Sequence, residues 1–309
     1  MDVAILGNIV ADILASPMDL RAPPPPGGLQ SLRSLILATG GSVCNVGLAL
    51  RRLGMTVGAA GLVGEDALGS MILDRLREAG VDVACVRTEA RFQTSATVVA
   101  VEPTGERTFF HTPGMTSLVD AAMFRRCAQM FRTCAWLHIG YFGLLPSLTT
   151  DLPGLLAELR TQSPTTRISL DTANPPSSRE LLDAILPHLD LFAPSRPEAI
   201  ALTGETDPAR MVARFRRAMP GGLIGIKLDR DGCHLDAGGV AHRVPAYEVS
   251  VMDTTGAGDA WFAGLLCALS REMPLEQCGR LANRVAADCC TALGAVTGIC
   301  TLDQTLAHL

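Results

Sequence analysis

The most informative stretch of this chain reads Asp253-Thr254-Thr255-Gly256-Ala257-Gly258-Asp259. Before it, Val249 to Val251 are predicted to end a strand. After it, the almost wholly apolar run from Ala260 to Ser270 predicts a buried helix. A helix start presents free backbone N–H groups and the positive end of the helix dipole, and glycines let an anion approach them closely. The stretch therefore predicts an anion-binding turn between a strand and a helix.

Asp259 would lie beside the bound anion, in the first turn of the predicted helix. A carboxylate in that position can accept the proton of a substrate hydroxyl while the hydroxyl oxygen attacks a phosphorus atom. The simpler alternative is a glycine-rich turn in which Asp259 only caps the helix. An isolated Gly-x-Gly-Asp pattern would favour that alternative, but the rest of the chain reverses the preference.

Composition restricts the class of protein. The chain has 309 residues, of which 48% are hydrophobic and 18% charged, so it can bury a sizeable core. A net charge of -5 gives no reason to expect nucleic acid as a partner. Apolar runs end well before the length of about 18 residues that indicates a membrane span, and the first residues lack the basic start of a signal peptide. Ten cysteines without a Cys-x-x-Cys pair indicate reduced thiols in a cytoplasmic protein.

From Ala135 onward, strands and helices are predicted to alternate. Each predicted strand ends in a polar loop, and parallel strands present such loops at one edge of a sheet, where α/β proteins bind ligands. The predicted strands are Trp136 to Ile139, Arg167 to Leu170, Leu189 to Ala193 and Leu223 to Leu228. The side chains expected to converge at this edge are Asp171, Asn174, Ser195, Glu198, Lys227 and Asp259. The chain is therefore predicted to be an α/β protein with a mostly parallel sheet.

Near the N-terminus, a strand from Val3 to Leu6 precedes Asp12, and Gly40-Gly41 opens a helix pattern with Asn45 in its first turn. Two glycines allow a small ligand to approach the main chain, and the amide of Asn45 offers both a donor and an acceptor. This combination suits the hydroxyl groups of a polyol, although a tight turn with a capping amide explains the same residues equally well. Arg107, on a predicted hairpin, either reaches an anionic group or lies on the surface.

The run from Asp253 to Gly264 closely resembles the second signature of the ribokinase-like carbohydrate kinases, the PfkB family. Gly40-Gly41-Ser42-Val43-Cys44-Asn45 resembles the first signature of that family, a Gly-Gly followed by Asn, and the likeness covers nearly the whole chain. It implies a ribokinase-like α/β fold, with a mostly parallel central sheet flanked by helices in one domain over residues 1–309. It also implies a small β-lid formed by about residues 10–38 and 92–115, and leaves open a homodimer formed through that lid.

The resemblance also implies roles for individual residues. Asp259 would be the base, and the N–H groups of Gly256, Ala257 and Gly258 would stabilise charge on the transferred phosphoryl group. The substrate would be bound by Asp12, Gly40, Gly41, Asn45 and Arg107. ATP would be bound by Ser195, Lys227, Gly232, Gly258 and Asn283, with Glu198 acting on magnesium indirectly. A potassium ion held near Asp253, Thr255 and Gly294 is left open.

Two positions depart from the family pattern, both in the nucleotide half. Ser195 stands where the family has an asparagine three residues before Glu198, and Lys227-Leu228-Asp229 stands where it has Thr-x-Gly. These departures keep open a non-catalytic sugar- or nucleotide-binding protein on the same fold, but they leave the chemistry at Asp259 untouched. A nicotinamide dehydrogenase is disfavoured because no Gly-x-Gly-x-x-Gly follows the first strand.

We therefore predict an ATP- and magnesium-dependent kinase that phosphorylates a hydroxyl group of a small sugar. Kinases of sugar phosphates in this family commonly carry a basic residue after the Gly-Gly, whereas Ser42 stands there in this chain. An unphosphorylated sugar is thus the expected acceptor, and an adenosine-type nucleoside is the alternative.

Overall fold

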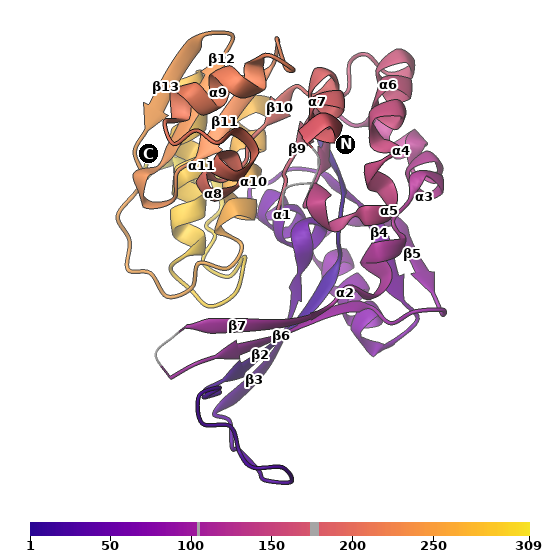
Figure 1. Ribbon diagram of the computed structural model, residues 1–309, viewed down its shortest axis with the longest axis vertical. Coiled ribbons are helices and arrows are strands. Elements are labelled where there is room, and N and C mark those ends of the chain that lie inside the picture. The colour runs from indigo at the N-terminus through magenta and orange to yellow at the C-terminus, as the bar shows by residue number, and fades with distance from the viewer. Residues whose placement is uncertain (104–105, 174–178) are drawn as a thin grey trace.

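The computed structural model describes residues 1–103, 106–173 and 179–309 (Figure 1). Asn174 and the Thr104-Gly105 pair of the predicted hairpin turn lie outside the described residues. In the described part of the chain, the strands form a nine-stranded sheet and a separate four-stranded sheet. The two sheets are called the large sheet and the small sheet below.

The large sheet is parallel over most of its width. Its strand order is β13-β12-β11-β10-β9-β8-β1-β4-β5, with β12 and β13 joined antiparallel at one edge. The strands are β1 (Val3–Leu6), β4 (Val57–Gly64), β5 (Asp82–Glu89), β8 (Trp136–Ile139), β9 (Arg167–Leu170), β10 (Leu191–Phe192), β11 (Leu223–Lys227), β12 (Cys233–Ala237) and β13 (Val240–Val244). Short apolar strands buried on both faces are typical of parallel sheets covered by helices. The predicted α/β fold with a mostly parallel central sheet is confirmed.

Helices cover both faces of the large sheet (Figure 1). Side chains alternate along β1, so that Val3 and Ile5 pack into one apolar core and Ala4 and Leu6 into the other. The first core includes residues of α1 (Gly41–Arg52), α2 (Ala67–Glu78), α10 (Ala257–Ser270) and α11 (Leu275–Cys289), with α12 (Leu302–Leu306) against it. The second includes residues of α3 (Ala121–Arg126), α4 (Ala128–Thr133), α5 (Pro146–Thr149), α6 (Leu152–Gln162), α7 (Arg179–Ile185), α8 (Arg196–Thr203) and α9 (Pro208–Arg216). No helix in the described ranges has the length and apolar content needed to cross a membrane.

The small sheet projects from one end of the molecule (Figure 1). Its order is β3-β2-β6-β7, with β2 (Val10–Ser16), β3 (Ser34–Gly40), β6 (Ser95–Val101) and β7 (Arg107–Thr112). In its register Asp12 lies beside Thr97, and Thr97 beside His111. Because side chains alternate along a strand, Arg107 lies on the same face of the small sheet as His111 and Asp12.

The prediction of a strand ending at Val251 is wrong. Residues 245–252 form no strand, and the side chains of Val251 and Met252 are mostly exposed. The N–H groups of Met252 and Asp253 donate to the carbonyl of Cys290, at the end of α11. The segment therefore has its hydrogen bonds with a helix end rather than with a neighbouring strand. The helix predicted over Cys278 to Leu293 also ends earlier, at Cys289.

Candidate active site

The turn before α10 has the geometry of an anion-binding turn. Gly256 has φ +76°, and a Cβ at this position would lie 2.4 Å from the Cβ of Ala295, so only glycine fits. The N–H of Ala257 donates to the carbonyl of Thr254 at 3.2 Å. Within the described residues, no acceptor contacts the N–H groups of Gly256 and Gly258. These two donors lie at the start of a 14-residue helix and remain available to an anion.

The two carboxylate oxygens of Asp259 differ in their hydrogen bonds. Its Oδ2 accepts hydrogen bonds from Asn45 Nδ2 at 2.9 Å and from the Tyr141 hydroxyl at 2.6 Å. Its Oδ1 is buried and has no partner among the residues that the structure describes. A buried polar atom without a partner is costly. The arrangement fixes the carboxylate and reserves Oδ1 for a donor from outside the protein, such as a substrate hydroxyl.

The surroundings of Asp259 set its proton affinity. Burial raises the pKa of Asp259 to about 7, and the charge of Asp171 acts in the same direction. The hydrogen bonds from Tyr141 and Asn45 and the charge of Lys227 oppose this rise. Burial and the adjacent carboxylate raise the pKa of Tyr141 well above its ordinary value, so its hydroxyl stays a donor. A carboxylate whose pKa lies close to neutral pH is well suited to act as a general base.

A positive charge lies next to the turn. Lys227, at the end of β11, places its Nζ 2.9 Å from Asp171 Oδ1 and 4.7 Å from the centroid of the Phe262 ring. The same Nζ would lie 3.6 Å from a Cβ built on Gly258. Lys227 and Asp171 follow different strands of the large sheet, and they meet at the strand edge as predicted. The ammonium group can therefore contact a phosphate bound at the turn.

Ser195 and Glu198 form the start of α8. The N–H and the hydroxyl of Ser195 donate to Glu198 Oε2 at 2.7 and 2.6 Å. Glu198 also contributes to raising the pKa of Asp171, after the larger effect of burial. In the described ranges, no group of three or more His, Cys, Asp or Glu side chains could hold a metal ion. Glu198 and Asp171 are two carboxylates at this end of the large sheet that a magnesium ion bound with a nucleotide could approach.

Four of the five predicted substrate residues, Asp12, Gly40, Gly41 and Asn45, lie where β2 and β3 of the small sheet approach α1. A Cβ on Gly40 would lie 2.0 Å from Asp12 Oδ2, and a Cβ on Gly41, with φ +80°, would lie 2.6 Å from the Asn8 carbonyl oxygen. The two glycines thus allow the close approach of Asp12 and the main chain. Burial raises the pKa of Asp12 to about 6, with the Thr97 hydroxyl opposing it. Asn45 on α1 connects this region to Asp259.

Two predicted nucleotide residues have structural contacts instead. The Asn283 amide donates to the carbonyls of Val244 and Pro245 and accepts from Trp261 Nε1. Both hydrogens of its amide group and one lone pair of its amide oxygen are used to join α11, α10 and the segment after β13. Gly232, with φ +88°, lies where a Cβ would be 2.0 Å from the Val244 carbonyl oxygen, so packing alone requires glycine there.

Arg107, which was grouped with the predicted substrate residues, contacts the segment before α10. Its Nη1 lies 2.6 Å from Asp253 Oδ1 and also donates to the Thr255 hydroxyl. The N–H of Gly294 donates to Asp253 Oδ2 at 2.8 Å. The residues named for a potassium ion are therefore already linked to one another and to a guanidinium group, and they do not fit that ion.

Tyr141 was missed by the sequence analysis, although it contacts the base directly. It follows β8 and Gly140 and has φ +54°, an unusual conformation for a bulky residue. Polar groups that follow parallel strands converge at one edge of a sheet, and Tyr141 follows the predicted strand Trp136 to Ile139. Its phenol is less polar than a charged or amide side chain, so the sequence signal is weaker.

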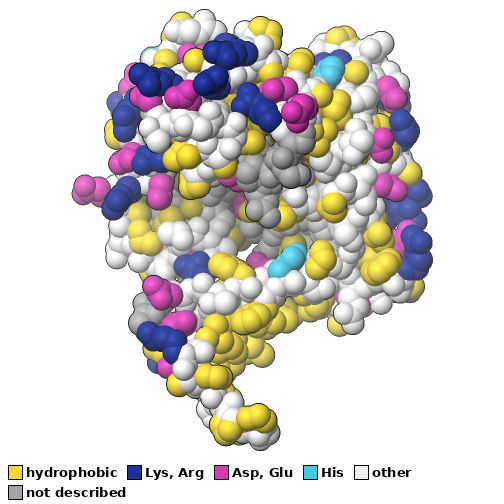
Figure 2. Space-filling view, in the orientation of Figure 1, with side chains coloured by type: hydrophobic (Ala, Val, Ile, Leu, Met, Phe, Trp, Pro, Cys, Tyr) yellow, Lys and Arg dark blue, Asp and Glu magenta, His cyan; other side chains and the backbone are white. Residues whose placement is uncertain are grey.

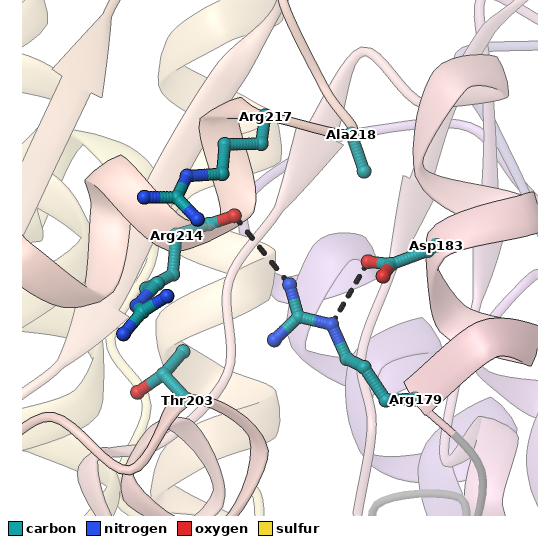
Figure 3. Close-up of a pocket in the computed structure, with 6 residues that line it drawn as sticks. All are labelled: Arg179, Asp183, Thr203, Arg214, Arg217 and Ala218. Atoms are coloured by element: carbon teal, nitrogen blue, oxygen red, sulfur yellow. Dashed lines mark hydrogen bonds and ion pairs between the residues drawn. The ribbon is translucent and has the colours of Figure 1, made fainter.

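A separate surface pocket of about 420 Å³ lies between α7, α8 and α9 (Figure 3). Arg179 crosses it and pairs with Asp183 at 2.8 Å. The pocket is lined by Arg179, Asp183, Thr203, Arg214, Arg217 and Ala218, which include none of the residues around Asp259. Arg179 and Arg214 form ion pairs with Asp183 and Glu205, and the pocket is not part of the candidate site.

Comparisons with known proteins identify the family of this chain. The model of the pfkB family of carbohydrate kinases matches residues 2–302. A fructokinase of Klebsiella pneumoniae is 31% identical over 285 residues, which cover 86% of this chain and 90% of the relative. A ribokinase of Haemophilus influenzae is 26% identical over 313 residues, covering 99% and 98% of the two chains.

Solved structures show the same fold. The ribokinase of Arabidopsis thaliana, complexed with ribose and ATP, superposes with a TM-score of 0.86 at 22% identity, covering 99% of this chain and 97% of that one. An Escherichia coli protein in complex with ATP and Mg²⁺ has a TM-score of 0.83 at 20% identity, covering 99% and 98%. Since the family model spans nearly the whole chain, this protein belongs to the pfkB family of carbohydrate kinases, which are phosphotransferases with an alcohol group as acceptor.

Proposed function

We propose that this protein transfers the γ-phosphoryl group of ATP to a hydroxyl of a small unphosphorylated sugar. The observation that carries the proposal is the pair formed by Asp259 Oδ1, buried and without a partner in the described residues, and the open N–H groups of the adjacent turn. A base and an anion site side by side are what in-line phosphoryl transfer requires. Relatives called fructokinase and ribokinase, and neighbours solved with ATP, support the choice of substrates.

The reaction follows from these contacts. The sugar hydroxyl donates its proton to Asp259 Oδ1 while its oxygen forms a bond to the γ-phosphorus, and the bond from that phosphorus to the β,γ-bridging oxygen breaks, releasing ADP. The N–H groups of Gly256 and Gly258 and the ammonium of Lys227 stabilise the charge on the phosphate oxygens. Magnesium, when bound with ATP, would neutralise part of the phosphate charge. Asn45 and Tyr141 keep the carboxylate oriented throughout.

An uncharged acceptor is favoured by the charges on the substrate side. Asp12 lies beside Gly40 and carries a negative charge at neutral pH, because its pKa is raised only to about 6. Ser42, where a basic residue would be needed for a sugar phosphate, is buried and bonds to Asn8. Arg107 is paired with Asp253, so it is not free to neutralise a second phosphate. Hydroxyl groups can donate to Asp12, whereas a phosphate would be repelled.

The test is a comparison of kcat/KM for fructose, ribose, 2-keto-3-deoxygluconate and adenosine with that for fructose 1-phosphate, fructose 6-phosphate and tagatose 6-phosphate. We expect an unphosphorylated sugar to be best. Asp259→Asn should lower turnover by about 10²–10⁴-fold while sugar binding persists, and the exposed Asp74→Asn serves as a control. A phosphorylated acceptor as the best substrate would contradict the proposal. Preference for adenosine would favour the nucleoside alternative, and binding without turnover the non-catalytic one.

We also propose that a second copy of the chain covers the outer face of the small sheet. On the face opposite Asp12, the register aligns Leu37, Ile13, Val98 and Phe110 across the four strands. Phe110 is 53% exposed and Leu37 38% exposed, and Figure 2 shows hydrophobic side chains gathered over this sheet. Light scattering should show a dimer that becomes a monomer in the Leu37→Asp, Phe110→Asp double variant. A monomeric wild type at assay concentrations would contradict this proposal.

A further inference from the structure

An arginine of the small sheet forms an ion pair with the anion-binding turn. Arg107, the first residue of β7, has its Nη1 2.6 Å from Asp253 Oδ1 and also donates to the Thr255 hydroxyl. The Arg107 side chain is 19% exposed and that of Asp253 is 2% exposed. Thr255 directly precedes Gly256, so the guanidinium lies beside the turn that would bind phosphate.

Asp253 has donors on both of its oxygens. Oδ1 accepts from the Thr255 N–H at 2.7 Å and from Arg107, and Oδ2 accepts from the Gly294 N–H at 2.8 Å. Burial by itself would raise the pKa of Asp253, but these donors lower it below its ordinary value, so the carboxylate is charged. A metal cation at Asp253 would have to displace Arg107 or approach three N–H donors.

One thiol lies against two carbonyl oxygens close to the turn, and its single hydrogen can be donated to only one of them at a time. The Cys289 thiol lies 3.3 Å from the Thr255 carbonyl oxygen and 3.1 Å from that of Ala295. The carboxylate of Asp253, the anionic ligand that a potassium ion would need here, already has hydrogen-bond donors on both of its oxygens. The geometry thus matches a guanidinium group, which is always charged and is more weakly hydrated than an ammonium group.

We propose that Arg107 supplies, from the small sheet, the positive charge that a bound monovalent cation would provide beside the anion-binding turn, so that the reaction of this chain requires no potassium. The inference rests on the proposed kinase function. Arg107 is a positioning residue in this scheme. It neutralises Asp253 and holds Thr255, and thereby keeps the turn in shape and leaves its N–H groups free for phosphate. Because Arg107 belongs to β7, this stabilisation of the turn requires the small sheet to lie against the segment before α10.

The kinetic test varies the cation at constant ionic strength, with potassium chloride replaced by tetramethylammonium chloride and ATP supplied as a potassium-free salt. We expect the wild-type kcat to change less than about twofold. Arg107→Ala should lose about tenfold or more in kcat, and Arg107→Lys should retain more activity than the alanine variant because it keeps the charge. The control is Arg21→Ala, which removes an exposed arginine that pairs with Asp19 and Glu102. Potassium activation of the wild type by more than about threefold, or an Arg107→Ala variant as active as the control, would overturn the proposal.

A binding measurement keeps the test independent of turnover. Thallium(I) can replace potassium and is followed by its own nuclear magnetic resonance signal. We expect no saturable thallium binding to the wild-type protein, with or without a non-hydrolysable ATP analogue. Saturable binding that potassium displaces would overturn the proposal even if every kinetic variant failed to fold. If no sugar or nucleoside is phosphorylated, the proposed function fails, but the thallium result still decides whether Arg107 occupies the place of the ion.

Discussion

Replacing Asp259 by asparagine should make the folded protein more stable at alkaline pH, although it removes the base. Burial raises the pKa of Asp259 to about 7, from an ordinary value of 3.8. Between these two pH values the folded state retains a proton that the unfolded chain has lost. The free energy of unfolding of the wild type therefore falls as pH rises through this interval, and the penalty is absent below pH 3.8.

The size of the effect follows from the same interval. Each pKa unit is worth about 1.4 kcal/mol, so the full penalty is about 4 kcal/mol. Asparagine stays neutral, its oxygen can take the place of Oδ2 between Asn45 and Tyr141, and its Nδ2 can take the place of the unpartnered Oδ1. We expect the variant to exceed the wild type by about 2–4 kcal/mol near pH 8.5, and by about 1 kcal/mol near pH 4.5.

Urea unfolding followed by circular dichroism at the two pH values measures this difference. Asp66→Asn is a control of opposite sign, because hydrogen bonds from Thr94 and Gly69 outweigh burial and lower the pKa of Asp66. The carboxylate of Asp66 stabilises the fold at pH values above the ordinary pKa of an aspartate, and this contribution is lost as the pH falls through the lower pKa of the folded state. The free energy of unfolding of Asp66→Asn should therefore be lower than that of the wild type at alkaline pH. If the wild type and Asp259→Asn differ equally at both pH values, or if the wild type is the more stable at pH 8.5, Asp259 has no raised pKa and the reasoning is refuted.

Three further predictions concern a neighbour of Asp259 and two residues that were predicted to bind ATP. Tyr141→Phe removes a hydrogen bond that lowers the pKa of Asp259, so the acid limb of kcat/KM against pH should move up by about 1–2 pH units; an unmoved limb would contradict the role of the hydroxyl. Asn283→Ala leaves Trp261 Nε1 and two carbonyls unpaired, so the free energy of unfolding should fall by about 2–4 kcal/mol while KM for ATP stays within about threefold. A large rise in that KM at unchanged stability would show a nucleotide contact instead. Ser195→Asn keeps a residue that can cap α8, so kcat/KM for magnesium-ATP should be preserved or improved, and a clear drop would show that the serine is a working adaptation.

Local features of the chain were enough to predict the fold class and to place several residues of the candidate site at one edge of the sheet. The apolar strands followed by polar loops predicted the parallel sheet, and Lys227 and Asp171 meet at its edge as expected. The glycines of the turn predicted the start of α10, because positive φ and the close approach of backbone atoms are local requirements. Hydrophobic periodicity and the residue preferences of turns act over a few residues, so the sequence alone reveals the elements that they specify.

Contacts between distant segments had to come from the tertiary structure. Tyr141 and Asp259 are 118 residues apart, and Arg107 and Thr255 are 148 apart. The pairs of side chains that meet depend on strand order, on register and on how the small sheet lies against α10. No short sequence pattern encodes these pairs. The same reason explains Asn283, whose amide serves the packing of α11, and the segment before Asp253, whose N–H groups bond to a helix end instead of a strand. The alternation of apolar and polar residues along the chain specifies which helices and strands form. The partner of each buried polar group is selected only when those elements pack, because every buried donor must then find an acceptor.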